Sequence, residues 1–392
     1  MKNILVASFD MEIGGVERSL VSMLNNFDYQ TYSVDLMLYS HTGEFMRLLP
    51  EKANLLKENK AYKTFRMPVL EVIKSGNFGL GFSRLLAKFL ANKDQSSENG
   101  YKQMQYMWKY AIPLLPKMDK EYDVAISYLW PHYFVAEKVE AKTKIAWIHT
   151  DFSTVETDIE MDVKMWSKFD HIVAVSEECK KAFVRKYPAL GERVIVIENI
   201  TTPELIHTLA TEGSNNPMIN DTRFKVITVA RLSYAKGIDT AVKALKILKD
   251  RGYDHICWYV VGYGGDEQQI KELIVENNVT DQFILLGKKI NPYPFIKEAD
   301  LYVQPSRYEG KAVTVVEAQI LSKPVLITNY PTANSQVKDG FDGTICELSA
   351  KGIADGIEKL YLDSQLREQL ANNCTSSVYS NLNELNKLYS LI

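Results

Sequence analysis

Cysteine is scarce in this chain of 392 residues, and its four copies lie far apart. They are Cys179, Cys257, Cys346 and Cys374, and no two of them form a C-x-x-C pair. Disulfide frameworks and structural zinc sites both depend on clustered cysteines, in zinc sites often together with histidines. We therefore expect four reduced thiols, and the scarcity argues against disulfide-stabilised and zinc-binding classes of protein.

The chain also lacks a marked excess of either charge. Its 46 basic and 49 acidic residues give a formal net charge of −3. Proteins that bind nucleic acid usually carry a basic surface, which this balance does not provide. We therefore expect no nucleic-acid partner.

Long apolar segments are the third absence. A transmembrane helix needs about 20 consecutive apolar residues, and no segment of the sequence approaches that length. The most apolar candidate, 124–136, is short and contains Pro131 and His132. The opening residues 1–7 are too few for a signal peptide and lead straight into a turn. These features predict a cytoplasmic protein.

Short apolar runs alternate regularly with longer amphipathic stretches along the chain. One series of strand-like runs covers 3–8, 32–39, 123–128, 144–149 and 171–176, and a second begins at 225–230. This alternation predicts parallel sheets with crossover helices, which is an α/β fold. The length of the chain favours about two domains.

A loop-like segment between the two series sets the expected domain boundaries. It contains the run Gly213-Ser214-Asn215-Asn216-Pro217, which is rich in turn-forming residues. We predict an N-terminal domain over 1–200, a linker over 201–222 and a C-terminal domain over 223–374.

Two carboxylates carry the most specific signal. Glu309 and Glu317 are separated by seven residues. A buried-strand pattern at 299–303 precedes them and leaves through Pro305 into a loop. If a helix starts near Ala312, its free amides and its dipole form a seat for phosphate between the two acids. One acid can then meet a sugar and the other a ribose, which predicts a site for a nucleotide sugar.

The spacing of the two acids resembles the E-x7-E motif of retaining glycosyltransferases, and the surrounding motifs resemble glycosyltransferase family 4. These motifs span nearly the whole chain in the family's order: Gly14-Gly15, His149, Arg231 with Lys236, Gly262-x-Gly264 and the acid pair. The resemblance implies the GT-B fold, in which two Rossmann-like domains with parallel sheets face a central cleft. It also implies that 375–392 forms a helix that packs back on the N-terminal domain.

The resemblance assigns roles to these residues. Arg231 and Lys236 would hold the donor diphosphate and stabilise the departing nucleotide by their charge. Glu309 would contact hydroxyls of the donor sugar, Glu317 those of the ribose, and His149 would orient the sugar. The predicted catalytic set is His149, Arg231, Lys236 and Glu309, and the predicted donor-binding set is Gly14, Gly15, Gly262, Gly264, Lys311, Ala312, Val313, Thr314 and Glu317. Taken alone, the glycines at 262 and 264 fit a plain strand-to-helix turn equally well.

These roles predict a retaining transferase that moves a hexose from a nucleotide-diphosphate sugar, with a UDP-sugar favoured, to a glycan acceptor. No metal or other cofactor is expected, since the sequence has no Asp-x-Asp pair and Arg231 with Lys236 can supply positive charge. Lys311-Ala312 stand where many relatives have an aromatic residue and a glycine, so the identity of the sugar stays open. Two alternatives also stay open: a non-catalytic GT-B subunit that binds glycan and supports an active transferase, and another GT-B enzyme such as a phosphorylase or an epimerase.

The segment 60–93 bears on the acceptor. It contains seven basic residues and one acid, Glu71, which gives a local charge of +6 in a chain that is net acidic. Phenylalanines and leucines interleave with these bases from Phe78 to Leu90. Such a segment can rest on an anionic membrane, or it can be a solvated helix packed on its own domain. In the first case the acceptor is a lipid-linked glycan, the protein is peripheral on the inner face of the membrane, and bacterial capsule, exopolysaccharide or wall-polymer assembly is the setting.

Overall fold

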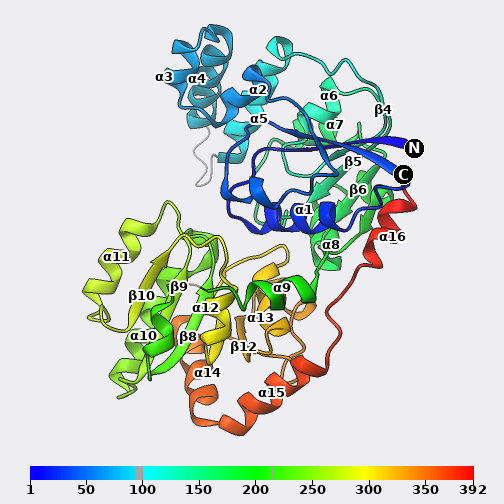
Figure 1. Cartoon of the computed structure of the whole chain (residues 1–392). Helices are drawn as coiled ribbons and strands as arrows, with labels where there is room; N and C mark the ends of the chain where they lie inside the picture. The colour runs from blue at the N-terminus through cyan, green and yellow to red at the C-terminus, as the bar shows by residue number, and fades with distance from the viewer. Residues whose placement is uncertain (94–99, 214) are drawn as a thin grey trace. The chain divides into compact units, whose positions relative to one another are not determined.

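Two compact units make up the fold in the computed structural model, which describes residues 1–93, 100–213 and 215–392 (Figure 1). The first unit comprises Met1–Glu12, Val16–Asn199 and Asn383–Ile392, and the second comprises Ile13–Gly15 and Ile200–Leu382. Each unit is built around one sheet with helices packed against it. The prediction of two Rossmann-like α/β domains is therefore confirmed.

A seven-stranded sheet forms the centre of the first unit, in the order β3-β2-β1-β4-β5-β6-β7. All neighbouring strands are parallel. The strands are β1 Lys2–Ser8, β2 Tyr32–Leu38, β3 Asn54–Leu55, β4 Tyr122–Ser127, β5 Ala141–Ile148, β6 His171–Ala174 and β7 Val194–Val196. The α-helices are α1 Gly15–Asn25, α2 Lys60–Lys63, α3 Val69–Lys74, α4 Phe78–Lys93, α5 Gly100–Ala111, α6 Tyr133–Lys138, α7 Ile159–Trp166, α8 Glu177–Lys186 and α16 Glu384–Tyr389.

The second unit has a six-stranded sheet in the order β10-β9-β8-β11-β12-β13, again with parallel neighbours. Its strands are β8 Phe224–Val229, β9 Ile256–Val261, β10 Phe283–Gly287, β11 Leu301–Gln304, β12 Val325–Thr328 and β13 Thr344–Cys346. Its α-helices are α9 Pro203–Leu209, α10 Ile238–Asp250, α11 Glu267–Glu276, α12 Tyr293–Glu298, α13 Val313–Ile320, α14 Ala350–Leu362 and α15 Ser364–Ser376.

The strands of the second sheet are buried on both faces. Val226 and Trp258 belong to one apolar core, whereas their chain neighbours Ile227 and Tyr259 belong to another. Successive side chains of a strand point to opposite faces, so the two cores lie on the two faces of the sheet. This explains why the strands appear in the sequence as continuous apolar runs instead of alternating ones.

Local sequence signals set the ends of several helices. The side chain of Ser176 caps α8 by accepting a hydrogen bond from the amide of Cys179. Glu177 and Glu178 occupy the first turn of α8, and Arg185 and Lys186 occupy its last turn. Acids near the start and bases near the end both interact favourably with the helix dipole, so this helix is specified by its own sequence.

The division into units differs from the predicted boundaries. Residues 201–222, predicted as a linker, lie in the second unit and contain α9 and the 3₁₀ helix Pro217–Asn220. Ile206 and Met218 are buried in the same core as Ile227, so these parts of the stretch pack within the second unit. The predicted C-terminal segment 375–392 is also divided, since residues up to Leu382 belong to the second unit and Asn383–Ile392 to the first.

All four cysteines have free thiols. None of the described helices combines the length and the apolar character that a membrane-spanning segment requires.

Candidate functional site

The strand order of the second sheet reverses between β8 and β11, which are neighbours in the sheet but not in the sequence. The loops that leave these two strands emerge side by side at the carboxyl edge of the sheet. Open α/β sheets bind their ligands at such a reversal point. The loop after β8 carries Arg231 and Lys236, and the loop after β11 carries Glu309. Three of the predicted site residues therefore converge on one place in the fold.

Lys236 and Glu309 are in direct contact. The Nζ of Lys236 donates to Oε2 of Glu309 at 2.6 Å, although the two residues are 73 positions apart in the sequence. The Glu309 side chain is only 6% exposed, and that of Lys236 is 27% exposed. A buried carboxylate is stable only when a cation or hydrogen-bond donors compensate its charge, and Lys236 supplies that charge here.

Two further donors hold Glu309 from the other side. Its Oε1 accepts hydrogen bonds from Ser306 Oγ at 2.7 Å and from Gln304 Nε2 at 3.2 Å. Both Ser306 and Gln304 are fully buried. A carboxylate has about four acceptor positions, so these contacts and Lys236 leave room for one more donor, on Oε2. Glu309 is thus fixed in orientation and still able to accept a hydrogen bond from a ligand hydroxyl.

Gln304 extends this network away from Glu309. Its Oε1 accepts a hydrogen bond from the Tyr302 hydroxyl at 2.5 Å, and that hydroxyl lies 2.7 Å from Oγ1 of Thr314. Burial raises the pKa of Tyr302 well above its ordinary value, which keeps the phenol protonated. The network joins the Glu309 loop to the first turn of α13. Our sequence analysis missed Gln304, although a glutamine at the end of an apolar strand is a signal that could have found it.

Glu317 lies on α13 and is 4% exposed. The hydroxyl of Tyr293, a buried residue of α12, donates to its Oε1 at 2.9 Å. Tyr293 was also missed by our sequence analysis, because it stands in an apolar stretch and its hydroxyl has no recognisable motif. The second acid of the pair is therefore held from a neighbouring helix.

The segment between the two acids leads into α13, with Ala312 as the residue before its first turn. The amide of Ala312 donates to Oε1 of Gln336 at 2.9 Å, so the protein itself uses this amide. Lys311, Val313 and Thr314 are half-buried. The Ala312 amide is therefore already engaged by Gln336.

Arg307 clamps the two loops of the site together. Its guanidinium forms a two-pronged ion pair with Asp239, at 2.8 Å and 2.7 Å, and also donates to the carbonyl of Tyr234 at 2.7 Å. Its amide donates to the carbonyl of Ala235 at 2.8 Å. These partners flank Lys236 in the loop after β8. Arg307 is a third positioning residue that sequence reasoning missed, since an isolated arginine resembles an ordinary surface residue.

Arg231 is exposed at the carboxyl end of β8 and forms no ion pair with any of the described residues. Gly262 and Gly264 follow β9 and pass close to the Arg231 loop. A Cβ on Gly262 would lie 1.8 Å from the carbonyl oxygen of Ala230, and one on Gly264 would lie 2.1 Å from that of Leu232. Glycine is therefore required at both positions by backbone packing alone, which supports the strand-to-helix turn as their first role.

The remaining predicted residues belong to other parts of the chain. His149 directly follows β5 of the first unit, and its ring lies 4.8 Å from that of Tyr128. Burial lowers the pKa of His149 to about 3, so its imidazole is neutral near pH 7. Its Nε2 is buried without a hydrogen-bond partner among the described residues. Gly14 precedes α1, and Gly15 is its first residue.

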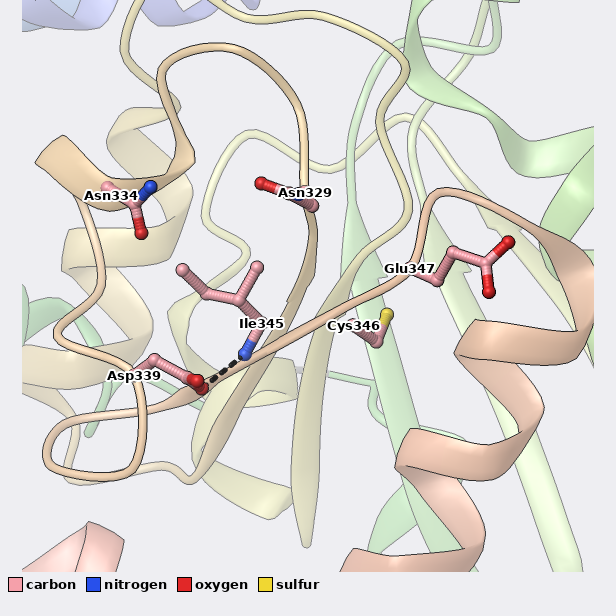
Figure 2. A pocket seen from close by; sticks show the side chains of 6 residues that line it. All are labelled: Asn329, Asn334, Asp339, Ile345, Cys346 and Glu347. Atoms are coloured by element: carbon pink, nitrogen blue, oxygen red, sulfur yellow. Dashed lines mark hydrogen bonds between the residues drawn. The ribbon is translucent and has the colours of Figure 1, made fainter.

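A pocket of about 310 Å³ opens beside β12 and β13 of the second unit (Figure 2). It is lined by Asn329, Asn334, Asp339, Ile345, Cys346 and Glu347. The carboxylate of Asp339 accepts a hydrogen bond from the Ile345 amide at 2.8 Å, which ties the pocket wall to the edge strand. None of these six residues is among the predicted site residues, and the contacts around Glu309 are a stronger indication of a functional site than this polar hollow.

Within the described parts of the chain, no three histidine, cysteine or acidic side chains gather in a way that could hold a metal ion. The independence of the reaction from metal remains a prediction.

Residues 211–376 match the family model of glycosyl transferases group 1. This region is similar to glycosyl transferases group 1. The match covers β8 to β13 and therefore includes Lys236, Glu309 and Glu317.

Two curated relatives illustrate the similarity. The capsular polysaccharide biosynthesis glycosyltransferase CapM of Staphylococcus aureus is 28% identical over 212 residues, which are 52% of this chain and 55% of CapM. The N,N'-diacetylbacillosaminyl-diphospho-undecaprenol alpha-1,3-N-acetylgalactosaminyltransferase of Campylobacter jejuni is 23% identical over 217 residues, 54% of this chain and 56% of that protein. The matched part of the chain spans about half the length of these relatives.

A solved structure extends the comparison to the whole chain. A mutant of Staphylococcus aureus TarM, in complex with Fondaparinux, alpha-GlcNAc-glycerol and UDP, superposes with a TM-score of 0.71 at 14% identity. The superposition covers 100% of this chain and 99% of TarM. At this identity the likeness concerns the fold. The matched region therefore lies in one of two Rossmann-like domains of a GT-B fold, as the sequence predicted.

Proposed function

We propose that this protein is a retaining glycosyltransferase that moves a hexose from a UDP-sugar to a glycan acceptor. The observation that carries the proposal is the buried contact of Lys236 with Glu309 at the reversal point of the domain that matches glycosyl transferases group 1. Glu317 lies on the helix that follows the same loop and is fixed by Tyr293. A cation and two immobilised carboxylates in this order suit a ligand that has a sugar, a diphosphate and a ribose.

Each residue would act on a different part of the donor. Glu309 accepts a hydrogen bond from a sugar hydroxyl through its remaining acceptor position, and Glu317 accepts from the ribose. When the bond between sugar and diphosphate breaks, negative charge develops on the leaving phosphate. Lys236 and the exposed Arg231 stabilise that charge, which is the contribution that lowers the barrier. The acceptor hydroxyl then attacks from the face that the nucleotide leaves, and a phosphate oxygen takes its proton.

A neutral His149 fits this proposal better than a charged one. At pH 7 an imidazole with a pKa of about 3 can donate or accept a hydrogen bond but carries no positive charge. Its proposed role is therefore to orient the sugar, and the positive charge is left to Arg231 and Lys236. We propose on the same ground that transfer needs no metal ion.

The acceptor we propose is a glycan linked to a lipid. The name of the Campylobacter jejuni relative specifies an acceptor carried on diphospho-undecaprenol, and CapM is named for capsular polysaccharide biosynthesis. An enzyme with such an acceptor would work in the cytoplasm as a peripheral protein at the inner face of the membrane.

Ligand-observed NMR with UDP-, GDP-, ADP- and dTDP-sugars tests the donor site directly. We expect one UDP-sugar to bind the wild type and not the Lys236→Ala/Glu317→Ala double variant, with or without EDTA. Lys271→Ala is the matched control, because it removes an exposed lysine that pairs with Glu267 on α11.

Three outcomes would change the proposal. Absence of binding by every donor would contradict the transferase assignment and favour the non-catalytic subunit. Equal binding by the double variant would contradict the placement of the site. Binding abolished by EDTA would contradict the metal-independent mechanism.

A further inference from the structure

Helix α4 of the first unit exposes apolar side chains along one face. Phe78, Phe82, Leu85 and Phe89 follow one another at intervals of four, three and four residues. Their exposed fractions are 68%, 67%, 49% and 59%. Residues at these intervals lie on the same side of a helix, so the four side chains form one continuous outward stripe. Leu70 of the adjacent α3 is 72% exposed and is a further apolar residue on this pair of helices.

The opposite side of α4 already faces the core of the unit. Leu80, Ser83, Ala87 and Ala91 are buried there, and α4 packs against α3 and α5 (Figure 1). A surface helix of a soluble protein normally places charged residues opposite its buried side. In α4 that position is taken by three phenylalanines and a leucine, which a soluble protein does not normally expose together on one helix face.

The charge around the stripe is positive, but fewer basic side chains surround it than the seven bases of 60–93 suggest. Arg84 is turned inward and donates to the carbonyls of Thr64 and Met67, and burial lowers its pKa. Arg66 forms an ion pair with Asp10 at 2.6 Å, and Lys63 forms one with Glu58 at 2.8 Å. These contacts engage three of the seven bases of 60–93 within the first unit.

Lys74 and Lys88 remain exposed beside the stripe. Lys74 ends α3, and Lys88 lies between Leu85 and Phe89 on α4. The sequence of α4 contains no acid at all, and Glu71 is the single acid of α3. The surface of α3 and α4 therefore combines bulky apolar side chains with the two lysines, and Glu71 is the single acid of these two helices.

We propose that the stripe Phe78, Phe82, Leu85 and Phe89 docks on an anionic lipid bilayer, with Lys74 and Lys88 on the headgroups. Apolar side chains on one helix face and flanking lysines are the features that hold interfacial helices to anionic membranes. A second copy of this chain is a poorer occupant, because a symmetric contact would bring four exposed lysines together and only two acids, the Glu71 of each copy, to oppose them. The inference rests on the proposed function, since it names the surface by which the enzyme would reach a lipid-linked acceptor.

Arg84 and Arg66 give this surface a direct connection to the rest of the first unit. Arg84 of α4 holds the carbonyls at both ends of the short 3₁₀ helix that contains Arg66. Arg66 in turn pairs with the buried Asp10, which lies in the loop between β1 and α1. Helix α4 is therefore connected by these contacts to the loop that follows β1.

Vesicle co-sedimentation tests the proposal with the full chain. The wild type should bind vesicles of phosphatidylcholine and phosphatidylglycerol much more tightly than vesicles of phosphatidylcholine alone. Phe82→Ser/Phe89→Ser should weaken binding by about tenfold or more, because apolar insertion is lost. Lys74→Gln/Lys88→Gln should weaken binding on the order of tenfold and should remove most of the preference for phosphatidylglycerol.

The matched control is Val275→Ser/Leu362→Ser, which removes two apolar residues of the second unit that are 63% and 66% exposed. It should bind vesicles like the wild type. Failure of the wild type to bind anionic vesicles, or equal binding by both stripe variants, would overturn the proposal. So would a concentration-dependent dimer that Phe82→Ser/Phe89→Ser abolishes, since the stripe would then be a contact between copies.

Donor binding separates this inference from the proposed function. The stripe variants should bind the UDP-sugar like the wild type, which also shows that they are folded. Vesicle binding without donor binding by the wild type would contradict the transferase assignment and leave the docking surface standing. Donor binding without vesicle binding would contradict the docking surface and leave the transferase assignment unaffected.

Discussion

At the residue scale, the hydroxyl of Tyr293 is the simplest part of the site to test. It donates to Glu317 in a buried setting, where one lost hydrogen bond to a charged group costs about 1–3 kcal/mol. Tyr293→Phe removes only that hydroxyl. We expect UDP to bind roughly fivefold more weakly, because Glu317 is then no longer held in the orientation that the ribose needs.

Isothermal titration with UDP measures this effect. Tyr253→Phe is the control, since it removes a tyrosine-to-glutamate hydrogen bond of the same kind, to Glu358. Tyr253 is not among the residues of the site, so its UDP affinity should match that of the wild type. Equal affinity of Tyr293→Phe and Tyr253→Phe would show that Tyr293 does not position Glu317.

His149 provides a prediction about pH. Its pKa of about 3 in the folded protein lies below the ordinary value of 6.5, so the unfolded chain takes up the proton more readily. The stability that neutral His149 contributes is complete above pH 6.5 and is lost as the pH falls towards 3. Within that window the loss is about 1.4 kcal/mol per pH unit.

Histidine ring NMR between pH 8 and pH 4 follows this group directly, with His149→Gln used to assign its signal. We expect the His149 ring to remain neutral throughout that range. The thermal midpoint of His149→Gln should also fall less steeply than that of the wild type below pH 6.5. A ring that titrates near pH 6.5 would contradict the buried, neutral imidazole.

At the scale of elements, Arg307 joins the loop after β11 to the loop after β8. Its planar guanidinium meets both oxygens of Asp239, and a lysine ammonium cannot reproduce that geometry. We expect Arg307→Lys to lower the unfolding free energy of the second domain by about 1–3 kcal/mol. Turnover should fall as well, because the clamp also fixes the backbone on either side of Lys236.

Thermal unfolding and kcat together test the clamp. Arg251→Lys is the control, since Arg251 pairs with Asp355 and Glu358 in partly exposed contacts that are expected to contribute little. Unchanged stability and unchanged kcat in Arg307→Lys would show that the two loops do not depend on this residue.

Helix α4 shows why an element can be predicted while its role cannot. The sequence indicates an apolar helix interleaved with bases, and a helix is what the structure contains. Its apolar residues divide between a buried side and an exposed side, and Arg84 belongs to the inward contacts. That division depends on α3 and α5 as neighbours, which no helical periodicity specifies.

At the scale of the whole molecule, the chain ends in the first unit after completing the second. Leu388 of α16 is fully buried, and the ring of Tyr389 lies 5.4 Å from that of Phe27 and 5.3 Å from that of Tyr32. Leu388→Ala should therefore lower the unfolding free energy of the first domain by about 2–5 kcal/mol. Differential scanning calorimetry measures the change.

The control for this substitution is Leu382→Ala. It changes a leucine that lies six positions earlier and is 42% exposed. Its thermal midpoint should stay close to that of the wild type. If Leu388→Ala also unfolds like the wild type, α16 is not part of the first core.

The fold class followed from the sequence because parallel strands covered on both faces must be continuously apolar and must alternate with crossover helices. The order of motifs likewise placed Lys236, Glu309 and Glu317 in one domain. Residues 201–222, predicted as a linker, belong to the second unit, where Ile206 and Met218 are buried.

The sequence by itself determined which charged groups the site contains, since the chemistry of a carboxylate or an ammonium belongs to the residue. Only the tertiary structure decided which of these charged groups are in contact. The contact of Lys236 with Glu309 bridges 73 positions and exists because β8 and β11 are adjacent in the sheet. Tyr293 and Arg307 could be recognised as positioning residues only there, because hydrogen bonding depends on distance in space and not on spacing along the chain.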